Sequence, residues 1–171
     1  QYGDYFGGSL QNSEDCSQLG RFYTWAAAMD SAAVYSRDGW GCGNGKICSQ
    51  RPPIRGVCPE GWHLPDSTEW KKLYAAVGES PQAMLVLGSD NWTDATDAFG
   101  FAARATMFDN YSSSYSYYTL FWASTEVGPN RLCVDGRTCA DLFYLSDEKV
   151  EFGQQNVYKE NFSSVRCVKN E

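Results

Sequence analysis

The sequence is poor in histidine. His63 is the only one among 171 residues, so no Ser-His-Asp arrangement can be built without its ring. It stands between Trp62 and Leu64, a setting that favours a packed, hydrogen-bonded ring over a general base. The sequence therefore predicts a protein that is not an enzyme.

Positive charge and long apolar runs are scarce as well. Lys and Arg number 14 against 21 Asp and Glu, which gives a formal net charge of −7, and no basic run is present. Such a chain has no electrostatic basis for binding nucleic acid or an anionic membrane. No stretch approaches the roughly 20 apolar residues of a membrane span, so we expect no transmembrane segment.

Cysteine, by contrast, is abundant, with seven in the chain. Their tight spacing, with so little histidine, favours disulfides in an oxidising compartment over zinc ligands in a cytosolic enzyme. We therefore expect a secreted or cell-surface, extracytoplasmic protein. A length of 171 residues, 43% of them hydrophobic, suits one domain with a sizeable core. We place that domain at residues 20–171, after an N-terminal arm or truncated lead-in at residues 1–19.

The clearest local signal is a helix start within residues 58–70. Asp66 can accept from the free N–H groups of a first helical turn, and Glu69, three residues on, can reach back to the chain before it. A helix is thus predicted from about Ser67, with Gly78 placed to end it. Its apolar positions recur at helical spacing and form one stripe that packs on a core: Trp70, Leu73, Tyr74 and Val77.

Two further regions have recognisable secondary structure. Residues 20–36 predict another helix, because their central residues are strong helix formers with Trp25, Ala28, Met29 and Ala32 on one face. Pro81 favours a short helical turn after Ser80. The C-terminal third predicts short strands at residues 121–125, 142–145, 149–152 and 164–168, with a hairpin turn at 146–148. The natural assembly is an α+β fold, with two helices packed on a twisted antiparallel sheet.

Two cysteine pairs share the pattern Cys-x-(Asn/Asp)-Gly-(Lys/Arg)-x-Cys. Asn-Gly and Asp-Gly favour tight chain reversal, so each pattern brings its two cysteines together. We pair Cys42 with Cys48 and Cys133 with Cys139. A metal or redox site is the alternative, but such sites usually need more ligands or a Cys-x-x-Cys spacing.

The stretch at residues 58–70, Cys-Pro-Glu-Gly-Trp-His-Leu-Pro-Asp-Ser-Thr-Glu-Trp, resembles the signature of the Fibrobacter succinogenes major paralogous domain, a bacterial extracytoplasmic module. Further blocks match in the same order at residues 20–29, 96–101, 121–126 and 164–168. More distantly, the Leu-Pro…Glu-Trp helix start and the Arg-Cys near the C-terminus resemble formylglycine-generating enzymes and the C-type-lectin-like fold.

The resemblance implies a C-type-lectin-like fold with long loops, in which a disulfide joins Cys58 to Cys167. Cys16 is then left unpaired. Relatives normally carry a further N-terminal strand and a cysteine shortly before the position of Cys16. The resemblance therefore implies either a fragment or an edge of the sheet supplied by another segment or a neighbouring chain.

A tyrosine-rich segment, residues 110–121, is the first candidate binding site. Tyr and Ser in this proportion resemble the composition of binding loops. The alternative is a surface loop whose tyrosines cover the domain's own core. The predicted ligand face comprises Tyr111, Tyr115, Tyr117, Tyr118 and Trp92.

Acidic residues near position 90 are weak calcium candidates. Asp90, Asp94 and Asp97 offer oxygen ligands, but their spacing is not that of an EF-hand, and ordinary capping and turn roles are the alternative. Sugar-binding C-type lectins carry Glu-Pro-Asn or Gln-Pro-Asp and Trp-Asn-Asp, whereas the nearest strings here, at residues 128–130 and 92–94, each lack a needed group. We therefore expect no cofactor.

Three functions are considered. The preferred one is a non-catalytic binding or adhesion module that binds a glycan or a surface protein. The second is a structural subunit of a surface filament that self-assembles through residues 1–19, because an open sheet edge invites a neighbour's strand. The third, a formylglycine-generating-type oxidase, lacks its closely spaced cysteine pair, since only Cys167 beside Arg166 stands at that place.

Carboxylates for glycoside hydrolysis form no specific pattern: Glu126, Asp141 and Glu151.

Overall fold

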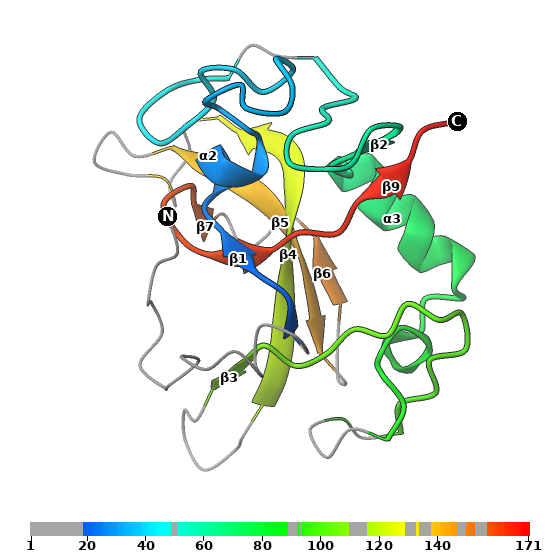
Figure 1. Cartoon of the computed structure of the whole chain (residues 1–171). Coiled ribbons are helices and arrows are strands. Elements are labelled where there is room, and N and C mark those ends of the chain that lie inside the picture. Colours follow the sequence, from blue (N-terminus) through cyan, green and yellow to red (C-terminus); the bar gives the residue numbers. More distant parts are fainter. Residues whose placement is uncertain are drawn as a thin grey trace.

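The computed structural model describes residues 19–48, 51–88, 92, 94–109, 116–128, 133, 138–146, 150–152 and 157–171. The fold is α+β, as predicted (Figure 1). Its helical elements are α2 (Trp25–Ala28), α3 (Ser67–Ala76) and the 3-10 turn η1 (Pro81–Ala83). Its strands are β1 (Phe22–Tyr23), β2 (Trp62–His63), β3 (Met107–Asp109), β4 (Ser116–Val127), β5 (Cys139–Ser146), β6 (Val150–Phe152), β7 (Val157–Tyr158), β8 (Ser163–Ser164) and β9 (Val168–Lys169).

The main sheet is built around the long β4–β5 ribbon. Its strand order is β1-β8-β4-β5-β6, with β3 paired to β4 and β7 paired to β5. The pairs are antiparallel, as predicted, with one exception: β4 and β8 are parallel through Phe121 and Ser164. β2 and β9 form a separate antiparallel ribbon near α3 (Figure 1).

The sheet is buried on both faces. On β4, Phe121 and Ala123 belong to one core cluster with α3, whereas Trp122 belongs to a second cluster with α2. This division follows from the two-residue period of a strand, which sends neighbouring side chains to opposite faces. The two helices accordingly lie on opposite sides of the ribbon (Figure 1).

Helix α3 begins and ends close to its predicted limits. Asp66 is its N-cap and accepts from the backbone N–H groups of Thr68 and Glu69, while Glu69 accepts from the N–H of Asp66. This is the predicted capping box. Trp70 is buried and stacks on Phe143 at a ring-centroid distance of 4.6 Å, which fixes the helix on β5.

The first predicted helix is much shorter than expected. Thr24 caps α2, but the helix ends at Ala28, and Ala32 is exposed instead of lying on the buried face. The backbone turns at Asp30, whose φ is 56°, and the Asp30 carboxylate then accepts from the N–H groups of Val34, Tyr35 and Ser36. An aspartate that caps a loop in this way competes with continued helix.

The β-rich predictions need two corrections. β4 begins at Ser116, so Tyr117 and Tyr118 lie in a strand and not in a binding loop. The predicted strand at residues 164–168 is split between β8 in the main sheet and β9 in the small ribbon. The chain passes from one sheet to the other between Ser164 and Val168, and Cys167 lies in this connection. The antiparallel pairing of β5 with β6 is confirmed, with Phe143 opposite Phe152, whereas residues 147 and 148 of the predicted turn lie outside the described residues.

Disulfides join Cys42 to Cys48, Cys58 to Cys167 and Cys133 to Cys139, which confirms the three pairings. Cys16 lies outside the described residues. Among the described residues, no helix is long and apolar enough to cross a membrane.

Candidate functional site

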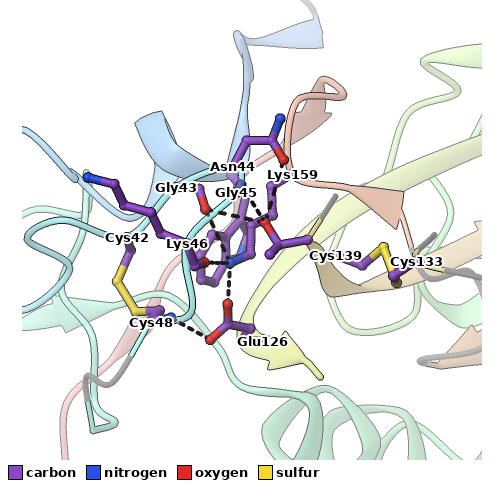
Figure 2. A network of polar contacts seen from close by, with 12 residues as sticks. Cys42, Gly43, Asn44, Gly45, Lys46, Cys48, Glu126, Cys133, Cys139 and Lys159 are labelled. Carbon is purple, nitrogen blue, oxygen red and sulfur yellow. Dashed lines mark hydrogen bonds and ion pairs between the residues drawn. A yellow bond between two sulfur atoms is a disulfide. The ribbon is translucent and has the colours of Figure 1, made fainter. Parts of the chain in front are cut away.

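A buried lysine is the centre of a network of polar contacts. The side chain of Lys159 is fully buried, and its ammonium donates to the carbonyl oxygens of Gly43, at 3.3 Å, and Lys46, at 2.9 Å, and to the carboxylate of Glu126. Figure 2 shows Lys159 and Glu126 pointing toward one another beneath the Cys42–Cys48 loop. An ammonium has three N–H donors, and all three are used here.

Neighbouring elements hold this lysine in place. It follows β7 directly, its N–H donates to the carbonyl of Thr138, and its own carbonyl accepts from the N–H of Trp25. The ammonium lies 4.2 Å from the ring centroid of Trp25, a favourable cation–π distance. Burial lowers the pKa of Lys159, and the hydrogen bond and charge of Glu126 oppose that shift.

The same network ties the two cysteine loops to one another. Glu126 accepts from the N–H of Cys48 at 2.6 Å (Figure 2). The Thr138 hydroxyl, beside Cys139, accepts from the N–H of Gly45 at 2.9 Å. Because the lysine's donors and the carboxylate are occupied by the protein's own groups, the arrangement fixes the loops. It offers no free nucleophile or base.

His63 is a packed ring, as predicted. Its Nε2 lies 2.8 Å from Oε1 of Glu69, and its Nδ1 lies 2.7 Å from Oδ1 of Asn170. Burial opposes ionisation of the imidazole, but the hydrogen bonds to Glu69 and Asn170 and the charges of Glu69 and Asp66 outweigh it, so the pKa of His63 is raised above 6.5. The ring joins β2, α3 and the chain after β9.

The candidate binding site is a cleft beside β1, β4 and β8, with a volume of about 510 Å³. Its floor and walls come from segments far apart in the sequence, which only the fold brings together. The lining residues are Leu19, Gly20, Arg21, Tyr23, Val57, Ala102, Arg104, Thr106, Thr119, Phe121, Ser164, Val165, Arg166 and Cys167. Among these described residues there are three arginines and no carboxylate.

Arg166 is the most unusual of these residues. Its guanidinium carbon lies 4.6 Å from the ring centroid of Phe101 and 5.7 Å from that of Phe121. Burial lowers the pKa of Arg166, and the charge of Asp97 partly offsets this. No residue in the described part of the chain accepts a hydrogen bond from this guanidinium or pairs with it as an ion.

The predicted aromatic face is distributed differently. Trp92 is buried in the core beside α3, where its indole N–H donates to the carbonyl of Ala103 at 3.1 Å. Tyr117 packs on the same cluster, whereas Tyr118 stacks on Tyr144 at 5.2 Å. The structure thus brings Trp92 and Tyr117 to the core and separates Tyr118 from them. The remaining two residues of this prediction, Tyr111 and Tyr115, lie outside the described residues.

The calcium candidates that the structure describes, Asp94 and Asp97, do not form a group of metal ligands. Asp94 and Asp97 have φ values of 54° and 44°, and Asp97 accepts from the N–H of Ala102 at 2.7 Å, which is a turn role. Asp90 lies outside the described residues. Across the part of the chain that the structure describes, no group of three His, Cys, Asp or Glu residues could hold a metal ion.

Sequence reasoning missed both Lys159 and Arg166 as central residues. Lys159 stands between Tyr158 and Glu160 and has the local pattern of an ordinary surface lysine. Arg166 had one usable signal, because it stands between apolar residues, directly after Val165 and before Cys167.

Comparison with known proteins gives the chain a family. A search of the curated proteins and a search of the solved structures each found no match. The family model of the Fibrobacter succinogenes major domain matches residues 5–169, which extends the resemblance noted in the sequence to nearly the whole chain. The chain therefore belongs to the Fibrobacter succinogenes major domain family.

Proposed function

We propose that this protein is a non-catalytic, extracellular binding module that takes a glycan at the bacterial cell surface. The observation that carries the proposal is the cleft of about 510 Å³ beside β1, β4 and β8. It has the size of a small-ligand site and combines aromatic, hydroxyl and guanidinium groups. Three disulfides support a location in an oxidising compartment.

The absence of a catalytic role is part of the proposal. Of the acidic residues weighed for hydrolysis, Glu126 is occupied by Lys159 and the N–H of Cys48, and Asp141 accepts from the hydroxyl of Ser67 at 2.6 Å. The side chain of the remaining one, Glu151, lies outside the described structure. His63 is held by Glu69 and Asn170. These groups are engaged in holding the fold, which supports binding over catalysis.

We also propose that the fold is C-type-lectin-like. Two helices on either side of a curled sheet support this, as does the bridge from Cys58, before α3, to Cys167, before β9. The β2–β9 ribbon brings the segment before α3 and the C-terminal segment together. An experimental structure that superposes on a C-type lectin over α3, β4 and β5 is the expected result, and a different strand connection would contradict it.

The function is tested by retention of the full chain on insoluble plant and microbial polysaccharides. We expect retention on at least one of them and release by the free sugar. Lack of retention on every glycan, together with a stable oligomer in solution, would contradict the proposal and favour the structural subunit. Measuring the solution mass by light scattering on the same sample separates these outcomes.

A further inference from the structure

We propose that the cleft recognises a carboxylate, and that the ligand is a sugar acid, a uronate unit of an anionic glycan, whose carboxylate is bound by Arg166. This inference rests on the proposed binding function and narrows its ligand to one chemical class. It gives a role to the guanidinium of Arg166, which lies against two aromatic rings and has no hydrogen-bonding partner among the described residues.

The geometry of Arg166 carries the first step. Phe101 and Phe121 lie against the guanidinium, so its position is set by ring packing. Its five N–H donors have no acceptor within the described part of the chain, although the group is half-buried. The guanidinium is therefore held in a fixed place with its donors still available, and a bound carboxylate would accept two hydrogen bonds at once through the matching fork geometry.

The charge around the cleft carries the second step. The chain has a formal net charge of −7, yet the described lining of this cleft includes Arg21, Arg104 and Arg166 and no acidic residue. The acidic residue that acts on Arg166 is Asp97, whose Oδ1 accepts from the N–H of Ala102. A local concentration of positive charge in an acidic protein favours an anionic ligand at this place.

Size and hydroxyl content favour a sugar over a bare anion. A volume of about 510 Å³ is far larger than a carboxylate or sulfate needs and suits a small ring-bearing ligand. Thr106 and Ser164 line the same cleft, and the Ser164 hydroxyl, which is buried, has no hydrogen-bond partner among the described residues. Tyr23 and Phe121 add aromatic surface against which a ring can pack.

The test is a calorimetric titration of the full chain with galacturonate and glucuronate oligomers, using the neutral galactose and glucose oligomers, acetate and sulfate as comparisons. We expect saturable binding of a uronate oligomer and none of its neutral counterpart. Arg166→Gln is expected to weaken it about tenfold to a hundredfold, the range of a charge-assisted hydrogen bond, and Arg166→Lys to weaken it too because the fork is lost. Arg37→Gln, an exposed arginine outside the cleft, is the matched control and should bind as the parent does.

Several outcomes would overturn the inference. If neutral oligomers bind as tightly as uronates, the cleft does not recognise a carboxylate. If acetate or sulfate binds as tightly as a uronate oligomer, the cleft does not recognise a sugar. An unchanged uronate affinity in Arg166→Gln would show that Arg166 does not bind the ligand. If that variant does not fold, Arg104→Gln at the exposed rim of the cleft replaces it, and we expect a smaller loss of uronate affinity. An unchanged affinity in Arg104→Gln would contradict binding in this cleft. Retention on neutral polysaccharides without uronate binding would leave the proposed function standing while this inference fails.

Discussion

At the scale of single residues, two cationic side chains, those of Lys159 and Arg166, are held in place by different contacts. Lys159 and Arg166 both lie against aromatic rings and both have their pKa lowered by burial, but their surroundings differ. The three donors of Lys159 meet three oxygens, whereas the guanidinium of Arg166 meets none among the described residues. The first is therefore a structural cation, and the second is the candidate for binding.

Replacing Lys159 by Met is expected to lower the free energy of unfolding by about 3 to 5 kcal/mol, because Glu126 would remain partly buried without its counter-charge. Denaturant unfolding measures this. Lys71→Met, at an exposed position of α3, is the control and should change stability by less than about 0.5 kcal/mol. A loss in K159M no larger than the control's would show that the network contributes little.

His63 predicts a pH dependence of stability. Its pKa is raised in the folded protein, so its contribution is fully present below the unfolded pKa of about 6.5 and is lost as pH rises through the higher folded value. Unfolding free energies of the parent and of Glu69→Gln are measured at about pH 5.5 and about pH 8.5. The difference between the two proteins, with the parent the more stable, should be larger at the lower pH. Gln keeps a capping oxygen at this position, so an equal difference at both pH values would mean that the His63 pair does not contribute.

At the scale of elements, α3 is the best specified part of the chain. Its cap, its apolar stripe and its end agree with one another, and Trp70 anchors it on Phe143 and Phe121. The first helix shows the opposite case. Helix-forming residues continue past Ala28, but the Asp30 carboxylate binds three backbone N–H groups and turns the chain away.

Asp66→Ala should lower the free energy of unfolding by about 1 kcal/mol, since it removes the acceptor for the N–H groups of Thr68 and Glu69. Asp66→Asn keeps an acceptor and should cost much less. Urea unfolding of the two variants gives the comparison, and equal losses would argue that charge at this helix end, and not capping, is what matters.

At the scale of the whole molecule, the long bridge closes the fold. Cys58 and Cys167 are separated by 109 residues, whereas each of the other two pairs is separated by 6. In the chain-entropy model a long loop constrains the unfolded state far more than a short one. The long bridge also fixes the point at which the chain leaves the main sheet for the β2–β9 ribbon.

Replacing Cys58 and Cys167 together by Ser should lower the unfolding free energy by about 4.7 kcal/mol, against about 2 kcal/mol for the pair Cys133 and Cys139. Thermal unfolding of both double variants under the same non-reducing conditions tests this order. Equal losses, or the reverse order, would contradict the entropic account of the long bridge.

The sequence by itself determined what depends on neighbours along the chain. The start of α3 needs only Asp66 and Glu69, and each short cysteine pair needs only the turn between its members. The family's ordered blocks supplied the long bridge as well. Only the tertiary structure decided the surroundings of Lys159, which come from Trp25, the Cys42–Cys48 loop and Glu126, and those of Arg166, which come from Phe101 and Phe121. Burial and electrostatic partnership depend on distance in space, and residues that lie far apart in the sequence carry no local pattern that records it.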